Sequence, residues 1–157
     1  MIIRPANAGD RPALLAQFQA LNVFEDAIAH DRRIDDAGAA LSLDTSWQAV
    51  RRDGGHALVA ETQGVVVGHL FLLFRDDEVF VRPERSRHGY VCDLFVREAA
   101  RGQGAGRALL AEAERLTRQA GLARLTIGVL AGNAAAAGLY AALGFTPYAV
   151  ELTKPLD

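Results

Sequence analysis

Residues 97–114, REAARGQGAGRALLAEAE, place three glycines within five residues directly ahead of a strongly helical segment. Glycine lowers helix stability, so three of them at a helix start suggest that the backbone itself is needed there. A glycine-rich turn that follows a strand and opens a helix leaves free N–H groups at the positive end of the helix dipole. This stretch therefore predicts a strand, an anion-binding turn and a helix, in that order.

Two common phosphate-binding loops do not fit this turn. A dinucleotide-binding fingerprint needs a third glycine where the chain has Arg107, and a Walker A loop needs a Gly-Lys-Ser/Thr ending that is absent after these glycines. The remaining pattern is R-x-x-G-x-G, formed by Arg101, Gly104 and Gly106. Taken alone, the segment leaves open a tight helix start that binds no ligand.

The rest of the chain predicts strands and helices in the order β-α-α-β-β-β-α-β-α-β. The expected strands are residues 2–4, 56–62, 65–74, 90–96, 123–130 and 145–153, and the expected helices start near residue 10, lie within 22–53, and span 104–120 and 133–143. The 56–74 region is typical of an antiparallel hairpin, whereas strand–helix–strand units from residue 90 onward imply parallel neighbours. We therefore expect an α/β (α+β) fold in which a mixed central β-sheet carries helices on both faces.

Composition narrows the class of protein. The 157 residues suit a single domain, 1–157, and 17 basic against 19 acidic residues give no basic field for binding nucleic acid. The single cysteine, Cys92, excludes an internal disulfide and suits a reducing compartment. We find no export segment or membrane-spanning stretch and no metal-ligand spacing among the four histidines. We expect a cytoplasmic protein without a metal, a nucleic-acid partner or a membrane partner.

Four motifs together give the chain a resemblance to the GNAT superfamily of acyl-CoA-dependent N-acetyltransferases. They are LFV at 94–96, R-x-x-G-x-G at 101–106, Asn133, and LY-x-x-L-G-F at 139–145. The resemblance runs from about residue 90 to residue 145. It implies a GNAT-like fold and the transfer of an acetyl group from acetyl-CoA to a primary amine, by direct attack in a ternary complex without a metal.

The resemblance also implies where acetyl-CoA binds. In this family the glycine loop holds the pyrophosphate through backbone N–H groups, and the preceding strand holds the pantetheine arm. Carried over by position, the expected cofactor-binding residues are Leu94, Phe95, Val96, Arg101, Gly102, Gln103, Gly104, Ala105, Gly106, Arg107, Asn133 and Ala136.

Tyr140 is the expected general acid. It follows Asn133 by seven residues, which is about two helical turns, so both side chains lie on one helix face. The family uses a tyrosine at this motif position to protonate the departing thiolate. A core tyrosine that only packs beneath the sheet is the alternative.

Asp93 is the candidate general base because it lies on the 90–96 strand, where relatives often carry an acidic residue. A purely structural, hydrogen-bonded role is an equal alternative. Strict strand alternation places Asp93 on the opposite face from Cys92, unless a bulge interrupts the strand. The Cys92 thiol itself is expected to be buried rather than nucleophilic.

The acetyl acceptor is less constrained by the sequence. Glu25 and Asp26, after the first expected helix, and Glu78, in the 75–88 connection, are candidates for attracting a cationic amine, although solvated surface acids are the alternative. We expect a primary amine on a small molecule. A protein N-terminus or lysine as the acceptor, or a non-catalytic acyl-CoA-binding regulatory module, remain alternatives. Edge strands and the last strand could also join two copies into a homodimer.

Overall fold

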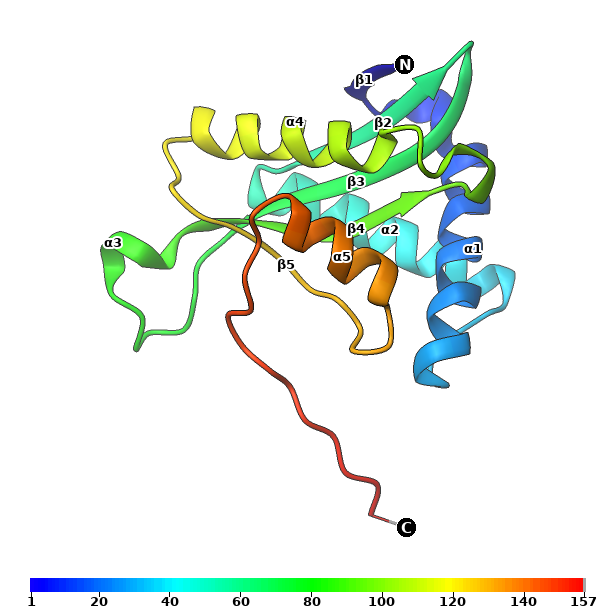
Figure 1. Cartoon of the computed structure of the whole chain (residues 1–157). Helices are drawn as coiled ribbons and strands as arrows, with labels where there is room; N and C mark the ends of the chain where they lie inside the picture. Colours follow the sequence, from blue (N-terminus) through cyan, green and yellow to red (C-terminus); the bar gives the residue numbers. More distant parts are fainter. Residues whose placement is uncertain (157) are drawn as a thin grey trace.

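The computed structural model of the protein describes residues 1–156 and is built around one five-stranded sheet with the strand order β1-β2-β3-β4-β5 (Figure 1). The strands are β1 (Ile2–Pro5), β2 (His56–Thr62), β3 (Val65–Arg75), β4 (His88–Val96) and β5 (Leu125–Ile127). The pairs from β1 to β4 are antiparallel, and β5 pairs with β4 in parallel. The predicted mixed sheet is confirmed.

Helices cover both faces of this sheet, as predicted (Figure 1). They are α1 (Arg11–Ala29), α2 (Asp36–Asp53), α3 (Pro83–Ser86), α4 (Ala105–Gln119) and α5 (Ala134–Ala142), with short 3-10 turns at Ala8–Asp10 and Glu98–Ala100. Residues of α1 and α2, including Phe18 and Leu43, bury one face around Phe71. Residues of α4, including Leu109, bury the other face, and α5 packs against that same cluster.

The last predicted strand, residues 145–153, is wrong: the chain after α5 forms no strand and runs away from the sheet (Figure 1). A strand needs a neighbouring edge that offers backbone partners, and the β5 edge is only three residues long. Pro147 also lacks the N–H that a ladder requires. Only Phe145 of this segment packs against the core, while Tyr148 and Val150 are exposed.

His69 is an ionisable residue held wholly inside the α1/α2 side of the core. Its ring stacks on Phe18 with 4.7 Å between ring centroids, and its Nδ1 lies 2.8 Å from Oε1 of Gln17. Because the Gln17 amide nitrogen donates to the Val66 carbonyl, the Gln17 oxygen is the acceptor and His69 Nδ1 carries the proton. Burial lowers the pKa of His69 to about 3, so the folded protein holds it neutral.

We predict that this histidine makes the fold acid-sensitive. Between pH 3 and its unfolded pKa of about 6.5, His69 is protonated in the unfolded chain and neutral in the folded one, so stability falls as the pH falls. Between pH 7 and pH 5, His69 lowers the free energy of unfolding by roughly 2 kcal/mol. Urea unfolding at both pH values measures this, and the variant His69→Leu should lose that part of the pH slope. If the free energy of unfolding depends on pH equally in the wild type and in His69→Leu, His69 is not the source of the acid sensitivity.

Candidate active site

The loop ahead of α4 presents a row of free backbone donors. Gly102 and Gly104 adopt left-handed φ values of +74° and +87°, and a Cβ at either position would meet no protein atom, so conformation rather than space demands glycine. Within the described chain, no group accepts a hydrogen bond from the N–H groups of residues 102–107. These donors lie at the N-terminus of a 15-residue helix. Such an arrangement suits an anion, as predicted for a pyrophosphate.

Side chains around the loop hold it in place. Arg101 donates from Nε to the Val96 carbonyl at 3.1 Å, and Gln103 donates to the Ala99 carbonyl at 3.0 Å. At Gly106 the reason for glycine is space, because a Cβ would lie 3.2 Å from a methyl group of Leu139. The first turn of α4 therefore lies directly against α5, close to the end of β4.

The sheet is open beside the second half of β4. Strand β5 pairs with β4 only over Gly89–Val91, so no strand of the described chain pairs with the β5-side edge of β4 beyond Val91. On its other edge, β4 remains paired with β3 as far as Val96. In the described chain, the β5-side edge of β4 is therefore unpaired from residue 92 to residue 96, and this unpaired edge is the gap between β4 and β5 that leads to the glycine loop. The expected cofactor residues Leu94, Phe95 and Val96 lie along it.

A β-bulge in β4 decides which side chains face which side. Phe71 lies opposite Asp93 and the next residue of β3 lies opposite Val91, so Cys92 is the extra residue. Val91 belongs to the cluster beneath α4, whereas Cys92 packs with the α1/α2 cluster and Asp93 is hydrogen-bonded to Ser46 of α2. Cys92 and Asp93 therefore share a face, contrary to strict alternation.

The Asp93 carboxyl lies in a recess with two hydrogen-bond donors. Ser46 Oγ donates to Asp93 Oδ2 at 2.6 Å, and the Cys92 thiol donates to the same oxygen at 3.2 Å. Burial raises the pKa of Asp93 despite these donors, although the residue as a whole is only partly buried. The carboxyl thus holds a proton more readily than an ordinary aspartate. Ser46 had no signal in the sequence that tied it to Asp93, because the contact spans 47 positions.

Tyr140 on α5 combines a packed ring with a hydroxyl that no described group binds. Its ring packs against the core beneath α4 and lies 5.9 Å from the Phe145 ring. Burial raises the pKa of Tyr140 to about 12, so the hydroxyl keeps its proton at neutral pH. Asn133, seven residues earlier, caps α5 by accepting a hydrogen bond from the Ala136 N–H at 3.1 Å.

Glu25 connects these groups electrostatically. Its negative charge contributes, after burial, to raising the pKa of Asp93 on β4 and of Tyr140 on α5. Glu25 lies inside α1, which continues to Ala29, rather than after the first helix as expected. The acidic pair Glu25 and Asp26 interrupts the apolar run of this helix, which is why the sequence suggested a shorter one.

The C-terminal end of α1 contacts both the residue ahead of the glycine loop and the chain ahead of α5. The Arg101 guanidinium lies 5.6 Å from the ring centre of Phe24. On the other side, a Cβ at Gly132 would come within 2.8 Å of Ile28, so the chain just ahead of Asn133 touches α1. The end of α1 is therefore one wall of the candidate site.

The other two acidic candidates have different surroundings. Asp26 accepts the Arg32 backbone N–H at 3.0 Å and so ties down the turn that follows α1. Arg32 also donates to Glu25 at 2.8 Å. Glu78 is exposed in the loop before α3. Figure 1 shows that α3 and this loop lie on the opposite side of the molecule from the end of α1. The charge of Glu25 acts on the pKa of Asp93 and of Tyr140, whereas Glu78 belongs to a loop remote from the end of α1 (Figure 1).

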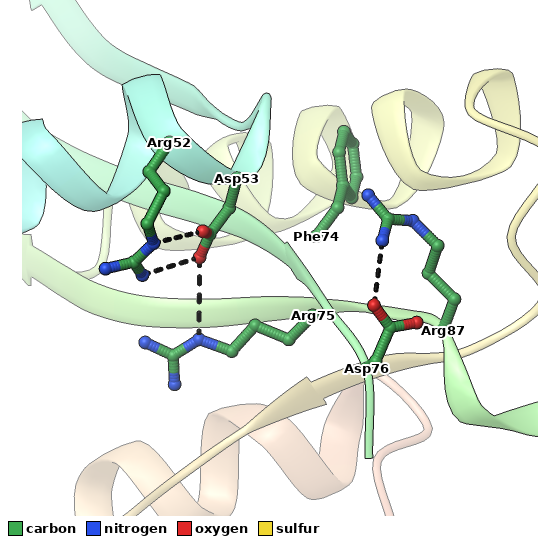
Figure 2. Close-up of a pocket in the computed structure, with 6 residues that line it drawn as sticks. All are labelled: Arg52, Asp53, Phe74, Arg75, Asp76 and Arg87. Carbon is green, nitrogen blue, oxygen red and sulfur yellow. Dashed lines mark hydrogen bonds and ion pairs between the residues drawn. The ribbon is translucent and has the colours of Figure 1, made fainter.

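A polar cavity of about 340 Å³ lies at the C-terminal end of β3 (Figure 2). It is lined by Arg52, Asp53, Phe74, Arg75, Asp76 and Arg87. Elsewhere, none of the helices described over residues 1–156 is both long and apolar enough to span a membrane. Over the same residues, no group of three potential metal-ligating side chains comes together.

Comparison with known proteins points in the same direction as the geometry. The family model for the acetyltransferase (GNAT) family matches residues 21–145. The chain is 30% identical over 147 residues to an L-methionine sulfoximine/L-methionine sulfone acetyltransferase of Salmonella typhimurium, covering 93% of this chain and 80% of that protein.

Solved structures show the same fold. A ribosomal-protein-alanine N-acetyltransferase from Brucella melitensis has a TM-score of 0.65 and 30% identity, with 92% of this chain and 83% of that chain covered. An aminoglycoside 6'-N-acetyltransferase from Acinetobacter haemolyticus has a TM-score of 0.71 at 20% identity over the whole of both chains. The latter likeness is one of fold alone.

We predict that Cys92 is unreactive in the folded protein. Burial, reinforced by the neighbouring Asp93, raises the pKa of the Cys92 thiol above its ordinary value, so little thiolate forms at pH 8. Ellman's reagent should react roughly 100-fold more slowly, or slower still, with the folded protein than with the protein in guanidinium. Because Cys92 is the only cysteine, the signal has one source. Fast reaction of the folded protein would mean that the bulge does not bury the thiol.

Proposed function

Because the chain belongs to the acetyltransferase (GNAT) family, we propose that it transfers the acetyl group of acetyl-CoA to the primary amine of a small molecule. The observation that carries this proposal is the row of free N–H groups at residues 102–107, which follows the open edge of β4 and lies where α4 packs against α5, the helix that carries Tyr140. The curated relative from Salmonella, whose named substrates are small molecules, supports the choice of acceptor class.

The residues around the gap fit a CoA thioester. The pyrophosphate would accept hydrogen bonds from the N–H groups of residues 102–107, with positive charge nearby from Arg101 and Arg107. The pantetheine arm would lie along residues 94–96, where β4 has no partner on the β5 side. Its sulfur end would then lie between β4 and the first turns of α5, near Asn133 and Ala136.

Three side chains would perform the chemistry. Acetyl-CoA supplies the acetyl group as a thioester. An alkyl amine arrives protonated, with a reference pKa of about 10.4. Glu25 attracts this ammonium group, and Asp93, whose pKa burial raises, accepts the proton whose loss makes the nitrogen nucleophilic. As the N–C bond forms, the nitrogen gives its second proton to solvent. As the C–S bond breaks, Tyr140 donates its proton to the departing sulfur, which leaves as a thiol, and Tyr140 regains a proton from solvent.

Two alternatives remain distinguishable by experiment. The 30% identical Brucella protein is a ribosomal-protein-alanine N-acetyltransferase, so a protein N-terminus is a second candidate acceptor. A regulatory module would bind acetyl-CoA without turnover. A thiol-release screen of amines, amino acids and peptides separates the three outcomes. Cytoplasmic location and pairing into a homodimer stay predictions that this chemistry does not require.

We predict that Tyr140→Phe slows acetyl transfer without weakening the binding of acetyl-CoA. Losing the proton donor should lower kcat/KM by roughly 100-fold or more. The affinity for acetyl-CoA, measured by calorimetry, should stay within about twofold because the pyrophosphate is held by backbone groups. Tyr148→Phe is the matched control, since this tyrosine is exposed on the C-terminal segment. Unchanged turnover in Tyr140→Phe would remove Tyr140 from the mechanism.

We predict that Ser46→Ala moves the acidic limb of the kcat/KM–pH profile to higher pH. The Ser46 hydrogen bond lowers the pKa of Asp93, so its loss leaves the carboxyl protonated over a wider range. Ser42→Ala, one turn earlier on α2, is the control and should leave the limb in place. If Ser46→Ala has the wild-type profile, Asp93 is not the base that this limb reports.

A further inference from the structure

Arg75, at the end of β3, is an arginine with free donors. Its guanidinium lies over the Tyr90 ring, 4.4 Å from the ring centre. Its nearest acid is Asp53, which is 4.0 Å from Nε, at the limit of an ion pair. No acidic group of the described chain pairs with its two terminal nitrogens, and Figure 2 shows them pointing away from Asp53.

The other two arginines of the same cavity are engaged. Arg52 donates two hydrogen bonds to Asp53, at 2.6 and 3.0 Å, and Arg87 pairs with Asp76 at 2.9 Å (Figure 2). These pairs satisfy the carboxylates that could otherwise occupy Arg75. The cavity of about 340 Å³ thus contains one guanidinium held in place by an aromatic ring and still able to bind an anion.

Arg75 lies on the same face of the sheet as the proposed base. Alternation along β3 puts Arg75 on the side of Phe71, which packs beneath α1 and α2, and the bulge puts Asp93 on that side as well. The charge of Arg75 lowers the pKa of Asp93, whereas that of Glu25 raises it. An anionic residue and a cationic residue therefore both act on the carboxyl at which we place the acceptor amine.

We propose that Arg75 binds the carboxylate of the acetyl acceptor, so that the acceptor is an amino acid whose amino group lies between Glu25 and Asp93. This inference rests on the proposed function and names the substrate class for the same site. A guanidinium presents parallel N–H donors that match the two oxygens of a carboxylate, which an amine without that group cannot use. The Salmonella relative is named for two amino-acid derivatives, which fits this class.

The test compares free amino acids with their carboxamides as acceptors. The probes are L-methionine sulfone, L-leucine and L-phenylalanine, each with its amide, in a thiol-release assay with acetyl-CoA. The wild-type protein should prefer at least one acid over its amide by roughly 10- to 100-fold in kcat/KM, and Arg75→Gln should bring that ratio close to one. Arg51→Gln, an exposed arginine of α2 that does not line this cavity, is the matched control and should keep the wild-type ratio.

The possible results test the role of Arg75 and the proposed acetyltransferase function separately. Retention of the acid preference by Arg75→Gln, or no such preference in the wild type while other amines are acetylated, would overturn the role of Arg75. Absence of turnover with every amine and peptide would instead overturn the proposed function. Circular dichroism and calorimetric acetyl-CoA binding check that Arg75→Gln is folded. If it is not, Arg75→Lys, which keeps the charge but loses the fork, should give an intermediate ratio, and a wild-type ratio in this variant would overturn the inference.

Discussion

The unequal pairing of β4 is the constraint on which the candidate site depends. One edge of this strand pairs with β3 almost throughout, while the other meets β5 over three residues only. Backbone groups in a protein interior need hydrogen-bond partners, so an edge left open in this way demands either water or a ligand. The glycine loop and α4 follow directly where the open edge ends, so the unpaired edge of β4 leads into the free N–H groups at the start of α4.

The bulge at Cys92 gives this open strand its chemistry. Without the extra residue, Asp93 would point to the α4 side of the sheet, into an apolar cluster where a carboxyl has no donor. With it, Asp93 turns toward α2 and gains the Ser46 hydroxyl, and it shares a face with Glu25 and Arg75. In this arrangement the Asp93 carboxyl lies in a poorly solvated recess. Its desolvation raises the pKa of Asp93 toward the range in which a general base is effective.

The positive and negative groups of the candidate site come from different structural elements. In the proposed site, the glycine loop would supply backbone dipoles and arginine charge for a phosphate-bearing donor, and the end of α1 would supply the Glu25 carboxylate on the acceptor side. Tyr140 lies on α5, which packs against α4 at Gly106 and Leu139. The proposed donor and acceptor groups thus lie on different elements, so the proposed acceptor residue Arg75, on β3, can vary without disturbing the glycine loop.

The sequence alone determined the elements whose signals are local. Glycines at left-handed positions, the helical run after Gly104 and the cap at Asn133 specify their own conformations within a few residues, so the turn, α4 and α5 were all predicted. The length of α1, the lost strand at 145–153, the face of Asp93, and the contacts of Ser46 and Arg75 were decided only by the tertiary structure. Each of these depends on which segments pack together across tens of residues, and on a single extra residue in β4, neither of which has a local signature in the chain.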